Sequence, residues 1–402
     1  MRIGFFILFL LSVTLSSAQV SSTDSLTNEP LNTANNIING NSSKNITIGG
    51  YAQIDYNQPI GSETREVGTL DVHRLVLFFG YKFGERTHFV TEIELEHVNQ
   101  VFVEQAFLNY RFSPALNLRA GLMLVPMGIV NEYHETPTFN GVERPNLDKY
   151  IVPTTWREIG IGFSGNITSL SLKYQAYLMN GFNGYDEEGG NFNGKNALRG
   201  GRQKGIESYM SSPNFSAKVD FYGIQGLKLG LAGYIGKSQS RLYDGLEEND
   251  PVAVSQADSS VVHIKMVGVD ARYQNSGFQA RAQVINARIG NTIEYNNFAQ
   301  SDLGSRLFGY FIEAGYDVLR PFDLNTQKQL ILFSRYEVYD THRATSGELS
   351  RNLAYDRTDI TLGATLKLTP GAAFKVDYQI MLNSAEGTNP NNLFNMGVGI
   401  WF

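Results

Sequence analysis

The charged residues of this 402-residue chain are spaced in a way that favours the polar face of a strand. Glu92, Glu94 and Glu96 occupy every second position of "TEIELE", and Arg335 and Glu337 repeat that spacing in "FSRYEVYD". Side chains two positions apart in a strand point to the same side. Carboxylates and guanidinium groups gathered on one face can bind ions and polar solutes, provided that water or an opposite charge compensates each of them.

Residue combinations that would indicate an enzyme are not found in the sequence. There are six His and no Cys, and "NEYHE" (residues 131–135) lacks the spacing of a helical HExxH zinc site. No GxSxG, no P-loop and no GxGxxG after a strand occurs. His73 and His88 have no obvious Ser partner for a lipase-type pair. We therefore predict no catalytic residue, no metal site and no cofactor.

The N-terminal stretch "MRIGFFILFLLSVTLSSAQ" has a basic Arg2, a short apolar run and the small residues Ser16 and Ala18. This pattern predicts a secretory signal peptide over residues 1–18, with a retained anchor as the alternative. Residues 19–44 are rich in Asn, Ser and Thr, so we predict a flexible polar segment. The formal net charge is -6, which argues against nucleic acid as a partner.

From residue 45 onward, segment after segment alternates apolar and polar residues with a period of two. In "AFKVDYQIML", for example, Phe374, Val376 and Tyr378 oppose Lys375 and Asp377. We count sixteen such segments, which predicts sixteen strands. Their predicted ranges are 45–57, 70–83, 87–97, 101–112, 116–125, 157–166, 169–179, 213–222, 226–236, 260–273, 277–288, 306–318, 328–340, 356–368, 372–384 and 393–402.

The lengths of these segments and of their connections favour a transmembrane barrel. Soluble β-sandwiches also alternate, but strands of 10–13 residues suit a tilted bilayer-spanning strand better. Short turns such as "FSPA" interleave with long polar loops, and aromatic residues recur near segment ends. We therefore predict an all-β fold, a transmembrane antiparallel β-barrel of about sixteen strands over residues 45–402, in the outer membrane of a Gram-negative bacterium.

The last segment, "NLFNMGVGIWF", keeps its apolar parity up to Phe402. A terminal strand must pair with the first strand, because an open edge cannot be left in hydrocarbon. Outer-membrane barrels end in an aromatic residue that the barrel-assembly machinery reads, and this C-terminus resembles that signal. We predict that Phe402 is the assembly signal and that outer-membrane lipid and this machinery are partners.

If the apolar parity faces lipid, the other parity faces the lumen. So many charges imply water inside, and sixteen strands are enough to enclose an aqueous channel. The alternative is a lumen blocked by loops. The predicted lumen residues most relevant to solutes are Arg74, Glu92, Glu94, Arg119, Arg281, Arg335 and Glu337, and the same face carries Lys218, Asp220, Lys228, Asp270, Glu313, Lys375 and Asp377.

The connection between the fifth and sixth segments is long and unusually apolar, with Val125, Met127, Ile129, Phe139 and Trp156. A solvent-exposed loop gains nothing from such residues, whereas a loop folded onto the barrel wall would bury them. We predict that this third extracellular loop folds inward and narrows the pore. It would offer Glu132, His134, Glu143, Arg144 and Lys149 to solutes, unless each of them serves only to pin the loop through a salt bridge.

The runs "HRLVLFFGYKF", "VEQAFLNYRF", "RAGLMLVPMGIVNE" and "TPTFNGVERP" to "PTTWREIGIGFSG" resemble the phosphate-selective porin O and P family. The resemblance covers about residues 45–402 and implies a sixteen-stranded, trimeric outer-membrane channel. In phosphate-selective members an arginine and lysine ladder guides the anion, for which Arg74, Arg119, Arg281 and Arg335 are candidates here. Glu92, Glu94 and Glu96 share that face, so we expect a weak ion preference.

The sequence thus predicts an outer-membrane porin, a homotrimer whose water-filled channel passes small hydrophilic solutes and ions, including anions such as phosphate. The alternative is an outer-membrane adhesin or scaffold barrel with a plugged lumen and ligand-binding loops. The Gly- and Asn-rich loops over residues 180–212 and 237–259 would then carry the binding function, whereas in a porin we expect them to be solvated covers.

Overall fold

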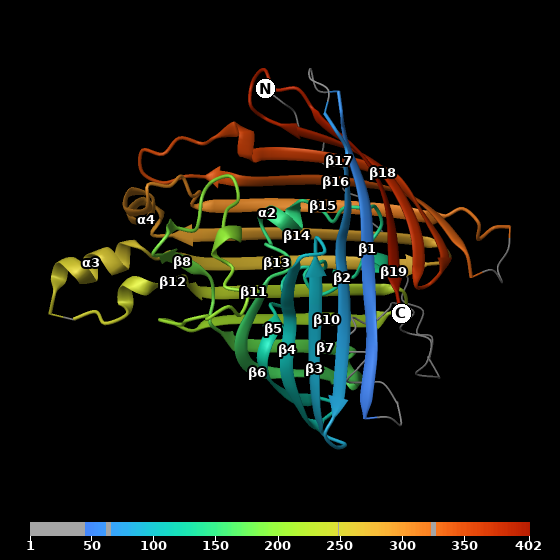
Figure 1. Ribbon diagram of the computed structural model, residues 1–402, viewed down its shortest axis with the longest axis horizontal. Helices are drawn as coiled ribbons and strands as arrows, with labels where there is room; N and C mark the ends of the chain where they lie inside the picture. Colours follow the sequence, from blue (N-terminus) through green and yellow to red (C-terminus); the bar gives the residue numbers. More distant parts are fainter. Residues whose placement is uncertain (1–44, 62–65, 248, 323–326) are drawn as a thin grey trace.

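The computed structural model describes residues 45–61, 66–247, 249–322 and 327–402. Sixteen antiparallel strands form a closed barrel, as predicted (Figure 1). The predicted signal peptide and the polar segment 19–44 lie outside the described residues. The barrel strands are β1 (Ile46–Ile60), β2 (Thr69–Lys82), β3 (Thr87–Glu96), β4 (Gln100–Ser113), β5 (Leu116–Leu124), β6 (Arg157–Ile167), β7 (Leu172–Met179), β10 (Asn214–Ile224), β11 (Leu227–Lys237), β13 (His263–Asn275), β14 (Phe278–Gly290), β15 (Arg306–Asp317), β16 (Gln329–Ala344), β17 (Asp356–Thr369), β18 (Ala372–Asn383) and β19 (Asn391–Trp401).

Each barrel strand pairs with its neighbours along the chain, and β1 pairs with β19 to close the ring. The closing register places Tyr51 opposite Trp401 and Ile60 opposite Asn392. Phe402 extends this pairing, because Gly50 N donates to Phe402 O and Phe402 N donates to Gly50 O, both at 2.9 Å. Closure removes the sheet edge that hydrocarbon could not solvate.

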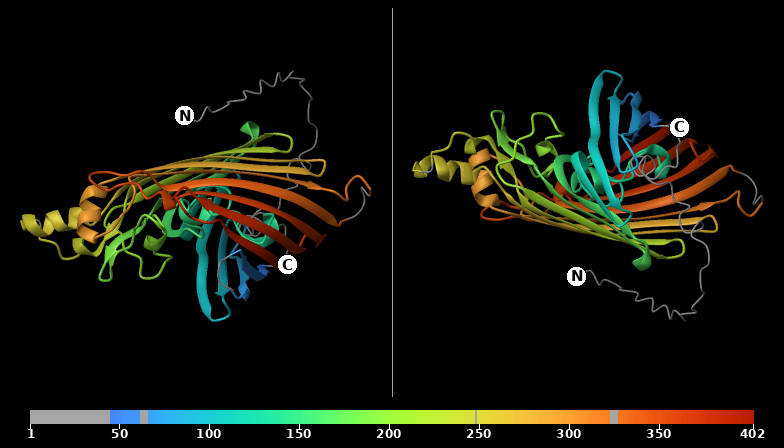
Figure 2. Two further views of the ribbon diagram at one scale, coloured as in Figure 1. Left: turned by 90° about the horizontal axis from the view of Figure 1, so that it is seen from above. Right: turned by 90° about the horizontal axis from the view of Figure 1, so that it is seen from below.

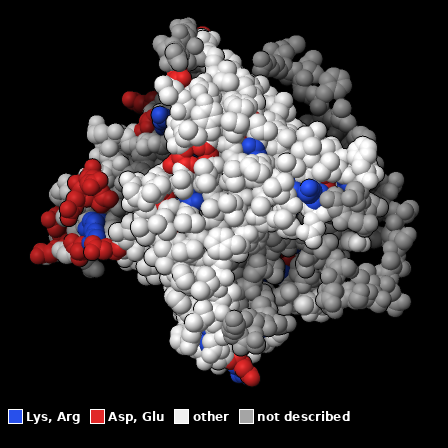
Figure 3. Space-filling model, turned by 45° about the vertical axis from the view of Figure 1, so that its right-hand side comes forward, with Lys and Arg blue, Asp and Glu red and all other residues white. Residues whose placement is uncertain are grey.

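The two parities of the strands face opposite environments. Outward residues such as Leu231, Ile312 and Phe374 are exposed, whereas inward residues such as Glu313 and Asp377 are buried. Much of the outer surface in view therefore carries neither Lys, Arg, Asp nor Glu (Figure 3). An apolar outside and a polar inside define a barrel made for a bilayer. Among the described residues, no helix is long and apolar enough to span a membrane.

Short turns connect the strands at one rim and long loops at the other. The long connections include L3 (residues 125–156), L4 (180–213), L5 (238–262) and L6 (291–305). They contain a three-stranded sheet of β8 (Asn183–Asp186), β9 (Gly189–Gly190) and β12 (Gln239–Ser240), and the helices α2 (Leu147–Tyr150), α3 (Pro251–Ser259) and α4 (Thr292–Ala299). The small sheet, α3 and α4 gather at one end of the barrel, whereas α2 lies within its outline (Figures 1 and 2).

The expectation that the loops over 180–212 and 237–259 are solvated covers is wrong for part of them. Phe182 and Phe192 of L4 are buried, and Phe192 packs on Tyr295 of α4 with ring centroids 5.6 Å apart. Phe192 N also donates to the Tyr295 hydroxyl at 3.1 Å. L4 is largely polar in composition, but its few aromatic residues pack it against the neighbouring loop.

We expect deletion of Phe402 to reduce the amount of assembled barrel. The deletion removes the two hydrogen bonds to Gly50 and the aromatic ring that packs against it. The measurement is the heat-modifiable band of membrane-inserted protein on a gel, with Phe402→Tyr as the control that keeps the ring. Unchanged assembly of the deletion variant would contradict an assembly role for this residue.

Candidate functional site

Loop L3 lies inside the barrel, and the strands hold its backbone from several sides. Ile129 N donates to Gln283 Oε1 of β14 at 2.6 Å, and Val142 N donates to Asp377 Oδ2 of β18 at 2.6 Å. Leu147 N, at the start of α2, donates to Glu337 Oε2 of β16 at 3.1 Å. Lumen side chains thus provide the hydrogen bonds that an irregular backbone needs when it is buried.

Two lysines of the barrel strands contact L3 through their ammonium groups. Lys218 Nζ, on β10, lies 2.7 Å from Glu132 Oε2 and donates to Gly128 O at 2.7 Å. Lys375 Nζ, on β18, donates to Thr136 O at 2.6 Å and Phe139 O at 2.7 Å. Both side chains are buried. Each ammonium therefore exchanges its water for oxygen atoms of the loop.

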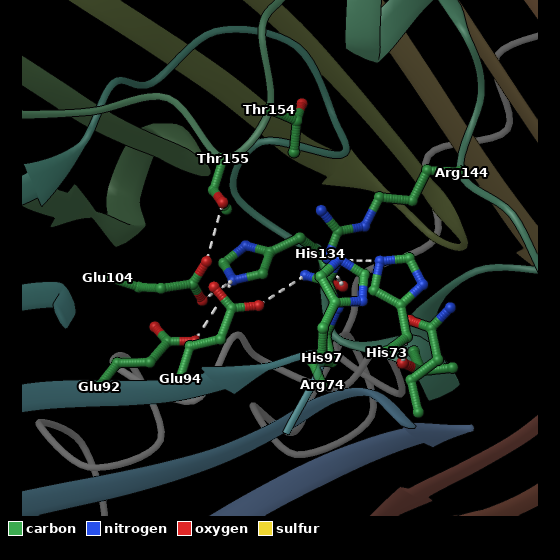
Figure 4. A network of polar contacts seen from close by, with 12 residues as sticks. His73, Arg74, Glu92, Glu94, His97, Glu104, His134, Arg144, Thr154 and Thr155 are labelled. Atoms are coloured by element: carbon green, nitrogen blue, oxygen red, sulfur yellow. Dashed lines mark hydrogen bonds and ion pairs between the residues drawn. The ribbon is translucent and has the colours of Figure 1, made fainter. Parts of the chain in front are cut away.

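A third contact joins L3 to β3 and β4. His134 Nε2 lies 3.3 Å from Glu92 Oε1 and 3.2 Å from Glu104 Oε2 (Figure 4). All three side chains are buried. We call Glu92, Glu104 and His134 the loop triad. Nearby, Arg144 Nη2 of L3 donates to the carbonyl of His134 at 2.9 Å.

Two of the arginines that the sequence suggested as rungs of a ladder belong to a network of ion pairs. Arg335 Nε donates to Glu337 Oε1 at 2.9 Å, and its Nη1 lies 3.4 Å from Glu313 Oε2. Arg281 is paired with the same Glu313. Arg335 also donates to the carbonyl of Glu143 in L3 at 3.2 Å. These guanidinium groups are thus largely compensated by carboxylates of the wall.

The other predicted site residues fall into two groups. Arg74 Nη1 is paired with Glu94 Oε1 at 3.2 Å. Arg119 Nε donates to Asn109 Oδ1 at 3.0 Å, and its guanidinium lies over the ring of Phe107. The predicted L3 residues Glu143 and Lys149 line a cavity at the loop rim. Arg74, Glu94 and Arg144 line the same cavity, so five of the predicted residues lie around one space and Arg119 lies apart from it.

The prediction that the lumen charges are bathed in water is wrong at the level of L3. Lys218 and Arg335 are each 1% exposed, and Glu313 is 2% exposed. Such burial of charge is tolerated because each group meets an opposite charge or a backbone dipole supplied by L3 or by a neighbouring strand. The alternation of the sequence located these charges on the lumen face, but it did not show that they pair across it.

Between L3 and the long loops lies a cavity of about 560 Å³, here called the vestibule, whose lining includes Arg199, Arg202 and Lys204 of L4. Arg199 Nη1 and Arg202 Nη1 donate to the carbonyl of Thr154 at 2.8 and 3.0 Å. Among the described residues, neither arginine is paired with a carboxylate. The sequence analysis missed these residues, because L4 resembles a solvated Gly- and Asn-rich cover.

Burial and charge shift the pKa values of several loop groups. Burial, then the neighbouring Arg199 and Arg157, lower the pKa of Arg202 to about 9. Burial, assisted by the charge of Asp270, raises the pKa of Asp148 to about 7, against the effect of its hydrogen bond from Gln283. For Glu132 burial is outweighed by the Lys218 ammonium, which lowers the pKa to about 2. For His134 burial is outweighed by Glu104 and Glu92, which raise the pKa to about 10.

The sequence analysis also missed Glu104, and the reason is local. The register between β3 and β4 shifts between Glu92 and Ile93, which marks a β-bulge. As a result the consecutive residues Glu104 and Gln105 are both buried on the inner side. Strict alternation cannot place two neighbours on one face. The available signal was the break in period within "VFVEQAF".

The closed barrel, the inward loop and the apolar exterior define a transmembrane β-barrel of the outer-membrane porin type. Solved structures share this fold. The anion-selective porin from Comamonas acidovorans has a TM-score of 0.56 at 12% identity, with 89% of this chain and 99% of that chain covered. OmpF of Salmonella typhi, in a complex with daunomycin, has a TM-score of 0.55 at 13% identity over 89% and 97%. The trimer form of OmpT of Vibrio cholerae has a TM-score of 0.51 at 11% over 89% and 99%.

Sequence comparison gives a nearer relative. An uncharacterized protein of Aquifex aeolicus (strain VF5) is 33% identical over 354 residues, which are 83% of this chain and 75% of the relative. The chain belongs to the family of this protein. No family model matches the chain.

We expect Lys218→Met to destabilise the barrel by about 3–5 kcal/mol, because it leaves the buried carboxylates of Glu132 and Asp270 without the shared ammonium. The measurement is unfolding of the detergent-solubilised protein in denaturant. Lys195→Met changes an exposed lysine of L4 and serves as the control. Equal stability of the two variants would show that the ammonium does not hold L3.

Proposed function

We propose that the protein is a passive channel of the Gram-negative outer membrane for small hydrophilic solutes, with a preference for anions. The observation that carries this proposal is a pair of polar cavities, one on each side of L3. The vestibule lies on the long-loop side, and a cavity of about 270 Å³ at the short-turn rim is lined by residues that include Lys228, Arg272 and Lys367. Solutes would pass from one cavity to the other along L3.

The charges of the two cavities support the anion preference. Seven basic residues line the vestibule, Arg74, Arg144, Lys149, Arg157, Arg199, Arg202 and Lys204, against four acidic ones, Glu94, Glu96, Glu143 and Asp148. The second cavity has Lys228, Arg272, Arg320 and Lys367 against Asp317. Excess positive charge at the mouths raises the local concentration of anions. Inorganic phosphate is one such anion and serves as a test solute.

The pairing of the lumen carboxylates weakens the sequence argument for a weak ion preference. That argument rested on Glu92, Glu94 and Glu96 sharing the lumen face. Glu92 lies against His134 and Glu94 is paired with Arg74, so two of the three carboxylates are compensated. Only Glu96 of this set then adds an acidic charge to the vestibule without an ion pair among the described residues.

The same proposal includes the surroundings of the channel. We propose a homotrimer in outer-membrane lipid, inserted by the barrel-assembly machinery through the strand that ends at Phe402. The trimer form of OmpT of Vibrio cholerae shares the fold. We assign no enzymatic activity, since the solved structures named above include porins and the buried groups around L3 are engaged with one another.

A plugged scaffold with ligand-binding loops is the second candidate, because L3 fills part of the lumen and the loops form an ordered lobe of β8, β9, β12, α3 and α4. Liposome swelling separates the two. We expect liposomes that contain the folded protein to swell in small sugars and amino acids. Folded protein that gives no swelling and no conductance would favour the scaffold.

We expect Lys204→Glu to lower the permeability ratio of chloride to potassium several-fold, since it changes the charge of the vestibule by two units. The measurement is the reversal potential across a planar bilayer in a KCl gradient, repeated with phosphate. The exposed Arg288→Glu makes the same charge change on the outer wall and is the control. Equal ratios for the wild type and Lys204→Glu would contradict a selective vestibule.

We expect the anion preference to increase as the pH falls through about 7. Burial raises the pKa of Asp148 to about 7, so this vestibule carboxylate is charged above that pH and neutral below it. In Asp148→Asn the preference should stay near its low-pH value, and the change between pH 5.5 and 8.5 should shrink. A variant with the full wild-type pH dependence would assign the change to another group.

A further inference from the structure

The loop triad brings three metal-binding side chains from three elements to one point inside the protein. Glu92 comes from β3, Glu104 from β4 and His134 from L3, and one ligand atom of each lies within 4.8 Å of the others. His134 Nε2 faces Glu92 Oε1 and Glu104 Oε2. Imidazole nitrogen and carboxylate oxygen are common ligands of divalent transition metals such as Zn²⁺.

The other polar atom of each residue is held by a separate partner. His134 Nδ1 donates to Asn131 O at 3.3 Å, and Gln105 Nε2 donates to Glu92 Oε2 at 2.6 Å. Thr155 Oγ1 donates to Glu104 Oε1 at 2.8 Å (Figure 4). This is the outer shell that orients metal ligands, in which a ligating histidine gives its remaining N–H to a carbonyl and each carboxylate is itself hydrogen-bonded.

The bond from His134 Nδ1 to a carbonyl also decides what the other ring nitrogen can do. With the proton on Nδ1, the lone pair of Nε2 faces two carboxylates, so it needs a cation. That cation is a second proton or a metal ion. A charge-assisted N–H to carboxylate bond is usually about 2.7–2.9 Å long. The separations here are 3.3 and 3.2 Å, close to the roughly 3.4 Å between two ligands of a tetrahedral Zn²⁺ with bonds of about 2.1 Å.

The β-bulge between β3 and β4 makes the triad possible. Without the shift at Glu92 and Ile93, Glu104 and Gln105 would point to opposite faces. The bulge turns Glu104 inward as a ligand while Gln105 orients Glu92. Bulges of this kind re-aim side chains at functional sites.

A buried hydroxyl without a partner lies beside the triad. Tyr51 of β1 is 0% exposed, its hydroxyl has no hydrogen-bond partner in the described part of the chain, and its ring meets the His134 ring edge-on at 6.2 Å between centroids. This hydroxyl is therefore a buried polar group next to the His134 ring, without a partner among the described residues.

We propose that Glu92, Glu104 and His134 form a structural site for a divalent transition-metal cation, with Zn²⁺ as its probe, that fastens L3 to β3 and β4. The cation takes the place of the Nε2 proton, which is released to solvent, so metal affinity falls at low pH.

Arg157 Nη1, 3.9 Å from Glu104 Oε1, and Arg74 are the competing positive charges. Thr155 and Arg157 also line the vestibule, from which an ion can enter.

A second group of acidic residues around a histidine offers a matched control. In Asp55, His73 and Glu143 the histidine Nδ1 lies 2.7 Å from Asp55 Oδ2 and its Nε2 lies 2.9 Å from Arg74 Nη2. Both ring nitrogens have ordinary hydrogen-bond distances, and Nε2 is engaged by a guanidinium. His73→Gln therefore changes a half-buried histidine without altering a residue of the proposed site.

The test is binding of Zn²⁺ to the folded, chelator-treated protein in detergent, measured by titration calorimetry and by metal content after dialysis. We expect one Zn²⁺ per chain in the wild type and in His73→Gln, and none in Glu104→Gln. Thr155→Val, which removes an outer-shell bond, should weaken binding by about 10–100-fold. Heat modifiability on a gel identifies folded variants.

The proposal is overturned if the folded wild type binds no Zn²⁺, or if Glu104→Gln and Thr155→Val bind as the wild type does. In that case the triad is an ion pair with His134 protonated. If Glu104→Gln does not fold, the wild type alone decides, because X-ray absorption at the zinc edge should show nitrogen and oxygen ligands with one imidazole. A spectrum without imidazole would also overturn the proposal. Neither result depends on conductance, so the channel function is tested separately.

Discussion

Every backbone N–H and C=O group that crosses hydrocarbon must be hydrogen-bonded within the protein. In this chain that constraint is met by closing the sheet, with β1 against β19 and Phe402 joined to Gly50. The rest of the structure depends on this closure. It gives the strands one face toward lipid and one toward an enclosed interior, and it decides that the charged parity of each strand has to be satisfied inside the barrel.

Inside the barrel, L3 provides many of the partners that the charged side chains of the strands need. The loop brings its own backbone dipoles and a few charged side chains, and the wall supplies groups of complementary sign. Lys218 meets Glu132, Lys375 meets the carbonyls of Thr136 and Phe139, and Asp377 meets the N–H of Val142. A charge that would be costly alone becomes a contact that fixes the loop. The same contacts leave a basic vestibule on one side of L3, where Arg199 and Arg202 point their donors at loop carbonyls.

The candidate site shows which residues an apolar–polar alternation with a period of two can place and which it cannot. Alternation placed Arg74, Glu92, Glu94 and Arg335 on the inner face, and it did so because the side-chain period of a strand is independent of what lies opposite. It failed at Glu104, where a bulge interrupts the period, and at Lys204, which lies in a loop with no period at all. Partners such as His134 for Glu92 are separated by 42 residues, and no local pattern encodes such a pair.

The sequence by itself determined the strand number, the parity of the regular strands, the closing role of the last segment and the inward path of L3, because each follows from where apolar side chains can be buried. The tertiary structure alone decided which lumen charges pair, that several lumen charges at the level of L3 are buried in ion pairs, and that L4 contributes the basic vestibule. These features depend on distances across the barrel. Such distances are set by strand register, the bulge between β3 and β4, and the path of L3.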